Sequence, residues 1–158
     1  MSDRQKIREL IDRFMACKRI ALVGLSSDPK SFSRALFNDF QKRGFDMTPV
    51  NPACDRIGDL PCYKRVSEIE PLVEAALIMT RSQVVPEILE DCRNAGVQLI
   101  WLYRSMGPGA VSSEALQFGR DNNLDLVPGY CPYMFWKDSG FIHGLHRLIM
   151  KIGGKFPE

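Results

Sequence analysis

This sequence of 158 residues lacks the features that are typical of membrane-spanning and secreted proteins. It contains no apolar run close to the ~20 residues that a membrane-spanning helix needs. Its first twenty residues mix charged and apolar side chains, whereas a secretion signal has a continuous apolar core. We therefore expect a cytoplasmic protein without a membrane partner.

Metal-binding, disulfide and catalytic patterns are also missing. The five cysteines are odd in number and form no CxxC motif, which argues against a disulfide framework and a zinc site. The only histidines, His143 and His146, have no carboxylate motif around them and form no recognisable metal site. No potential nucleophile has a base that the sequence places within reach. We expect binding rather than catalysis, and no bound metal.

A strong excess of one charge is absent as well. Lys and Arg total 21 against 19 Asp and Glu, which leaves a formal net charge of +2. Nucleic-acid-binding proteins normally present a concentrated basic surface, so this balance argues against nucleic acid as the main partner. The length matches one domain, which is large enough to bury a stable core.

Apolar residues recur with the periods of alternating helices and strands. Short apolar runs predict strands, and apolar residues at helical spacing predict helices between them. The predicted strands cover residues 19–24, 46–50, 74–80, 97–102 and 124–127. The predicted helices cover residues 1–17 and 139–153 and surround the apolar stripes at 32–40, 85–92 and 111–118.

Strands that alternate with helices predict an α/β fold with right-handed parallel crossovers. We therefore predict a single domain over residues 1–158, built on a doubly wound parallel sheet of five strands with flanking helices. With the strands numbered along the chain, the predicted order is 3-2-1-4-5. Ligands are expected at the carboxyl ends of the strands, where the strand order reverses.

The segment after the first predicted strand is rich in groups that bind phosphate. A glycine permits a tight turn, serine hydroxyls lie at the start of the next helix, and two cations follow. The free amide groups and the dipole of a helix N-terminus favour an anion at such a place. The alternative is that serine, aspartate and proline only cap the helix and form the turn. The candidate residues are Gly24, Ser26, Ser27, Lys30, Ser33 and Arg34.

The same segment lacks the dinucleotide fingerprint GxGxxG, because Gly24 is its only glycine. A NAD site also usually has Asp or Glu at the end of the second strand, where this chain has Asn51 and Pro52. Both departures weigh against an NAD(P)-dependent oxidoreductase with a degenerate loop, which we keep as an alternative.

A combination of short motifs resembles the small bacterial CoA-binding proteins. The motifs are VGLS at 23–26, Pro29 with Ser33, RGF at 43–45, PVNP at 49–52 and Tyr63. The resemblance runs from about Lys18 to Cys131, so the core of the domain is expected at about residues 18–131. It implies a Rossmann-like fold similar to the N-terminal domain of the succinyl-CoA synthetase α subunit, with coenzyme A or an acyl-CoA as the ligand.

The resemblance also implies how the ligand lies. Gly24, Ser26 and Ser33 would surround the diphosphate, and Val50, Asn51 and Pro52 would lie against the adenosine half. The end of the third predicted strand would line the next part of the site through Thr80 and Arg81, with Val85 behind them. Candidates for the 3′-phosphate are Arg56 and Lys64. By this placement, Gly24→Val would block the diphosphate.

Two segments depart from the family pattern, namely residues 103–109 and the aromatic stretch 127–136. Both are expected near the emerging pantetheine arm. The aromatic residues could cover the sheet or form a lid or dimer contact, because such residues are enriched in interface cores. We expect a non-catalytic CoA-binding or CoA-sensing protein. The alternatives are the oxidoreductase and an interaction module with a vestigial groove, and the sequence leaves open whether the protein is a homodimer.

Overall fold

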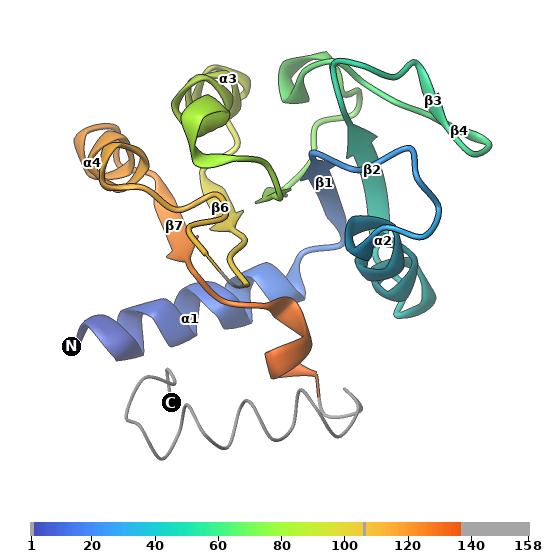
Figure 1. The fold of residues 1–158 in the computed structure, drawn as a ribbon. Coiled ribbons are helices and arrows are strands. Elements are labelled where there is room, and N and C mark those ends of the chain that lie inside the picture. The colour runs from blue at the N-terminus through green and yellow to red at the C-terminus, as the bar shows by residue number, and fades with distance from the viewer. Residues whose placement is uncertain (1, 106, 137–158) are drawn as a thin grey trace.

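The computed structural model of the protein describes residues 2–105 and 107–136. Its centre is one parallel sheet in the order β2-β1-β5-β6-β7 (Figure 1). The strands are β1 (Arg19–Val23), β2 (Asp46–Val50), β5 (Ala75–Ile78), β6 (Leu99–Leu102) and β7 (Asp125–Pro128). The predicted helix over 139–153, with His143 and His146, lies outside the described residues.

Helices cover both faces of the sheet. One face packs against α1 (Asp3–Ala16) and α2 (Phe32–Lys42), and the other against α3 (Val85–Ala95) and α4 (Ser113–Asp121) (Figure 1). Each face buries its own apolar cluster, since alternate residues of every strand point to opposite sides. The predicted doubly wound α/β fold is therefore confirmed. None of the helices among the described residues combines the length and the apolar character needed to cross a membrane.

The predicted strand order is wrong. Numbered along the chain, the observed order is 2-1-3-4-5, because β5 pairs with β1 instead of lying outside β2. Pro49 in β2 gives the physical reason, since proline has no amide hydrogen to offer a further strand on that side. The outer side of β2 carries an isolated bridge to Tyr63, whose amide donates to the Pro49 carbonyl (3.0 Å). The strand order consequently reverses between β1 and β5.

A small hairpin lies beyond the edge strand β2 and was not predicted. It pairs β3 (Arg56–Ile57) with β4 (Leu60–Pro61) in antiparallel orientation. Within the described ranges, the loops also contain the short 3-10 helices η1 (Val66–Glu68), η2 (Ser82–Val84) and η3 (Pro132–Phe135). The hairpin and η1 occupy the connection from β2 to β5 in place of a long helix.

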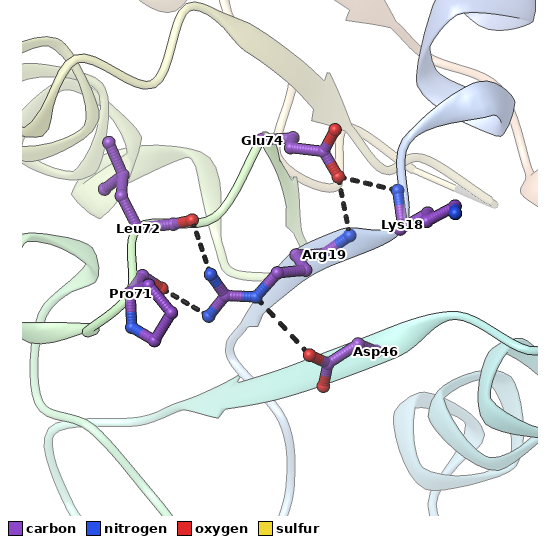
Figure 2. Close-up of polar contacts among 6 residues, drawn as sticks. All are labelled: Lys18, Arg19, Asp46, Pro71, Leu72 and Glu74. Atoms are coloured by element: carbon purple, nitrogen blue, oxygen red, sulfur yellow. Dashed lines mark hydrogen bonds and ion pairs between the residues drawn. The ribbon is translucent and has the colours of Figure 1, made fainter.

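A polar cluster fastens the amino ends of three strands together (Figure 2). The Glu74 carboxylate accepts hydrogen bonds from the backbone amides of Lys18 (2.7 Å) and Arg19 (2.8 Å). The Arg19 guanidinium in turn pairs with Asp46 (3.4 Å) and donates to the carbonyls of Pro71 and Leu72. These contacts link β1 to β2 and to the segment that enters β5.

We expect Glu74→Gln to lower the free energy of unfolding by about 1 kcal/mol at neutral pH, allowing for solvent screening of an exposed carboxylate. The two backbone hydrogen bonds hold the pKa of Glu74 below its usual value. A lowered folded-state pKa stabilises the fold above the unfolded-state pKa of about 4.3, and that stabilisation is lost as the pH falls through the folded-state value. Urea denaturation should therefore show a difference between wild type and variant that shrinks on acidification. A difference independent of pH would contradict this role.

Candidate functional site

The loop from Gly24 to Ser33, called the serine loop below, joins the carboxyl end of β1 to α2. Its hydrogen bonds centre on Ser33, whose Oγ accepts from the Ser26 amide (3.1 Å) and lies 3.2 Å from Ser31 Oγ. Ser26 Oγ accepts from the Asp28 amide (3.1 Å), and the Asp28 carboxylate accepts from the Lys30 amide (2.9 Å). The loop is therefore held in one shape by its own side chains.

The start of α2 carries donors that the fold leaves unused. Ser31 is the N-cap, and its Oγ accepts from the Arg34 amide (3.3 Å). Capping by a serine is therefore observed at Ser31. The amides of Phe32 and Ser33 donate no hydrogen bond within the described residues, as expected for the first turn of a helix. An anion at this end of α2 would find both amides and the helix dipole.

Arg34 adds a charge and an unpaired donor to the same place. Its Nη1 lies 3.4 Å from the Ser27 carbonyl, and its Nη2 points toward Gly58 at the tip of the hairpin. Its Nε is buried and has no hydrogen-bond partner among the described residues. A buried donor without an acceptor costs about 1–3 kcal/mol, and such a group calls for an explanation such as a ligand or a water.

Gly24 is required by the packing of the protein itself. Its φ of +92° is in the left-handed region, and a Cβ there would lie 2.8 Å from Thr80 Cγ2 and 2.9 Å from the Met79 carbonyl oxygen. The expectation that Gly24→Val would act by blocking a diphosphate therefore needs revision. A side chain at this position meets the end of β5 before it meets any ligand.

The end of β2, with Val50, Asn51 and Pro52 that were predicted to lie against adenosine, is beside the serine loop. Both ends of the Asn51 side-chain amide are hydrogen-bonded, because Nδ2 donates to the Leu25 carbonyl (2.9 Å) and Oδ1 accepts from the Ala53 amide (2.9 Å). Val50 is buried and its carbonyl accepts from the Gly24 amide (2.8 Å), whereas Pro52 is exposed. Asn51 thus ties β2 to the loop, and Pro52 offers the accessible surface.

The end of β5 is the third part of the predicted site. Thr80 contacts the serine loop next to Gly24, and Arg81 is exposed at the start of η2. Val85, the first residue of α3, has no exposed surface and belongs to the apolar cluster on that face of the sheet. Thr80 and Arg81 thus lie at the carboxyl end of β5 next to the serine loop, whereas Val85 is inaccessible to solvent.

The two cations suggested for a 3′-phosphate already have partners on the hairpin side. Lys64 Nζ pairs with Asp55 (2.6 Å) and donates to the Cys54 carbonyl (3.0 Å). Arg56 donates to the Asp59 carbonyl (2.6 Å). These three contacts are local and at least partly exposed, so a phosphate could bind either cation only by displacing its present partner.

An aromatic group that the sequence did not predict as part of the site lies where the start of α2 meets the segments that follow β6 and β7. Phe32, at the start of α2, lies 5.6 Å from Tyr103 and 5.9 Å from Tyr133 between ring centroids. The Tyr133 hydroxyl donates to the Asp39 carboxylate on α2, and this bond holds the pKa of Asp39 below its usual value. Burial raises the pKa of the Cys131 thiol, which disfavours the thiolate that a nucleophile needs.

A cavity of about 420 Å³ lies at the opposite, amino edge of the sheet. Its charged lining groups are engaged, since Arg13 pairs with Asp125 (2.8 Å) and Glu74 accepts the two backbone amides. Ligands of open α/β sheets bind at the carboxyl edge. We therefore assign the candidate site to the serine loop and its neighbours.

Comparison with known proteins adds an independent observation. The sequence profile of the family described as "CoA binding domain" matches residues 18–137. The chain is 26% identical over 126 residues to the uncharacterised protein YneT of Bacillus subtilis (strain 168), covering 80% of this chain and 88% of that protein. It is 31% identical over 81 residues to an ADP-forming acetate–CoA ligase of Methanocaldococcus jannaschii, covering 51% of this chain but 12% of the ligase.

Solved structures also include a small protein that matches most of this chain. A conserved hypothetical protein from Pyrococcus furiosus superposes with a TM-score of 0.63 at 28% sequence identity. The match covers 72% of this chain and 95% of that one. The similarity thus extends over nearly the whole of some small proteins and over a short part of a much longer ligase.

Proposed function

The chain belongs to the CoA-binding domain family, and from this membership we propose that it binds coenzyme A, or an acyl-CoA, at the carboxyl edge of its sheet. The proposal treats residues 1–158 as one domain whose binding core is about 18–131. It extends the family assignment to a ligand and to particular residues of this chain.

The observation that carries the proposal is the set of unused donors at the start of α2. The amides of Phe32 and Ser33 and the buried Nε of Arg34 lack acceptors among the described residues. A diphosphate supplies several anionic oxygens, and hydrogen bonds to ionised acceptors are shorter and stronger than neutral ones. In this assignment the diphosphate lies against Gly24, Ser26, Ser27 and Ser33, with Lys30 and Arg34 as the nearby cations.

The rest of the ligand follows from the neighbouring strands. The adenosine half would lie against Val50, Asn51 and Pro52, and the next part of the molecule would pass Thr80 and Arg81. Asn51, whose side chain is hydrogen-bonded to the backbone of the protein at both ends, stands where NAD-binding proteins usually carry an acid for the ribose hydroxyl, which supports CoA over NAD(P).

We further propose that the protein binds CoA without transforming it. The Cys131 thiol has a raised pKa, and no group of three or more histidine, cysteine or acidic side chains among the described residues could hold a metal. The ligase relative offers no ground for ligase activity here, because the chain spans 12% of its length. A role in sensing, carrying or delivering CoA fits these observations.

A pair of serine variants tests the proposed site. Ser31→Ala and Ser112→Ala each remove an N-cap of the same kind, from α2 and α4, and each should cost about 1 kcal/mol of stability. Only Ser31→Ala frays the helix turn that presents the amides, so we expect it alone to weaken CoA binding, by about fivefold.

The measurement is a thermal-shift titration with CoA, dephospho-CoA and NAD⁺, followed by isothermal titration calorimetry of both variants. A ligand that binds only the folded state raises the melting temperature with its concentration. Stabilisation by CoA, weaker with dephospho-CoA and absent with NAD⁺, is the expected result. Stabilisation by NAD⁺ alone would favour the oxidoreductase. No shift with any of the three would favour an interaction module.

A further inference from the structure

An exposed aromatic ring stands directly beside the proposed phosphate site. Phe32 follows the N-cap Ser31, and its side chain is 42% exposed. Its ring is tilted by 31° against that of Tyr103, with centroids 5.6 Å apart, and makes an edge-type contact with Tyr133 at 5.9 Å. We call these three residues the aromatic platform. No contact within the described chain covers the outer surface of Phe32.

The strand order fixes which part of a bound CoA would reach this platform. CoA is a linear molecule that runs from adenosine through diphosphate and pantetheine to the thiol. The adenosine half is assigned to β2, at one edge of the sheet, and the diphosphate to the loop after β1. The remaining arm must then run away from β2, toward β6 and β7, whose carboxyl ends carry Tyr103 and the 130–136 segment.

We propose that the aromatic platform binds the apolar acyl group of an acyl-CoA thioester, so that the preferred ligand is an acyl-CoA rather than free CoA. This inference rests on the proposed function and adds the ligand class of the same site. Aromatic faces and edges make favourable contacts with an aromatic or branched acyl group. Free CoA would leave this surface in water.

Polar groups under the platform suit a thioester. Tyr103 is half-buried, and burial raises the pKa of its hydroxyl, which therefore stays protonated at neutral pH. A protonated hydroxyl can donate to a carbonyl oxygen. Tyr133 is held in place by its bond to Asp39, so the platform is fixed before a ligand arrives. A prearranged surface loses less entropy on binding than a mobile one.

The size of the patch favours an acyl group over a second protein chain. Large hydrophobic side chains are exposed at three places among the described residues: Phe32, Leu72 and Val84. Leu72 lies at the amino edge beside Arg19 (Figure 2), and Val84 lies in η2 after β5. Stable protein interfaces bury about 800 Å² on each partner. One exposed ring with two half-buried neighbours is a surface on the scale of a small ligand.

The experiment compares the dissociation constants of CoA, acetyl-CoA and benzoyl-CoA by isothermal titration calorimetry. We expect benzoyl-CoA to bind wild type about tenfold more tightly than CoA, with acetyl-CoA close to CoA. Phe32→Ala should abolish the preference for benzoyl-CoA, because it removes the exposed ring of the aromatic platform. Leu72→Ala is the matched control, since Leu72 is 43% exposed but at the other edge, and it should change neither constant.

Each outcome bears on one of the two proposals. Equal affinity of wild type for CoA and benzoyl-CoA, or a preference that survives Phe32→Ala, would overturn the acyl subsite while leaving CoA binding intact. Loss of the preference for benzoyl-CoA in both Phe32→Ala and Leu72→Ala would also overturn the acyl subsite, because the loss would then not depend on the aromatic platform. Failure of wild type to bind any of the three ligands would overturn the proposed function and the subsite together.

Discussion

Replacing Gly24 with alanine is expected to lower the free energy of unfolding by about 3 kcal/mol, through two separate penalties. An L-residue at φ +92° adopts the left-handed region at a cost of about 1–2 kcal/mol. The added Cβ also meets Thr80 Cγ2 at 2.8 Å and the Met79 carbonyl oxygen at 2.9 Å. Overpacking of this kind costs about 1–3 kcal/mol, and here a backbone atom is one of the obstacles.

Gly44 provides the control for this prediction. Its φ of +89° is nearly the same, but nothing lies within 4 Å of a Cβ built there. Gly44→Ala should therefore show the conformational penalty alone, about 1–2 kcal/mol. Urea denaturation of wild type and both variants gives the contact penalty as the difference between them. Equal losses for the two variants would show that the loop and β5 separate without cost.

The same variant bears on function, because Gly24 lies where β1, β2 and β5 meet. Its amide donates to the Val50 carbonyl, and the Val23 carbonyl accepts from the Met79 amide (both 2.8 Å). Moving Gly24 away from Thr80 displaces the serine loop from both neighbouring strands. We therefore expect the stable fraction of Gly24→Ala to bind CoA more weakly, whereas Gly44→Ala binds it as wild type does.

The local elements of this fold are readable from the sequence because their apolar residues follow helical or strand periods. The predicted strand at 46–50 has the bounds of β2, and the stripe at 85–92 lies within α3. The hairpin was missed because β3 and β4 are two residues long each, too short for any periodic pattern. The strand order was mispredicted although Pro49 already marks β2 as an edge strand.

The candidate site, like the fold, could be predicted from the sequence only in part. The serine loop could be proposed from the sequence because glycine, serines and cations follow one another along the chain. The aromatic platform was missed because its residues come from α2, from the end of β6 and from η3, and only the fold brings them together. In the sequence, Phe32 is the first residue of an apolar stripe with Leu36 and Phe40, both of which are buried. Phe32 is exposed whereas Leu36 and Phe40 are buried, and no pattern in the sequence predicts this difference.

Trp101→Ala is expected to cost about 4 kcal/mol, the largest loss of stability among these variants. Trp101 is fully buried in β6, with Phe14 of α1 and Phe135 of η3 packed edge-to-face at centroid distances of 5.1 and 5.7 Å. Its indole Nε1 also donates to the Tyr130 carbonyl (2.9 Å). Alanine leaves a cavity between α1 and the sheet and removes the hydrogen bond that fastens the start of the 130–136 segment.

The position of Trp101 makes its functional consequence distinct from that of Gly24. The 130–136 segment carries Tyr133 of the aromatic platform, whereas the serine loop lies against β1, β2 and β5. Trp101→Phe, which keeps a ring but loses the indole donor, should cost about 1–3 kcal/mol for the unpaired carbonyl and remain folded for titration. We expect this variant to bind CoA as wild type does and to lose part of the preference for benzoyl-CoA. If Trp101→Phe instead loses CoA affinity and keeps the preference for benzoyl-CoA, the ligand would run in the opposite direction along the sheet, with its acyl group at β2.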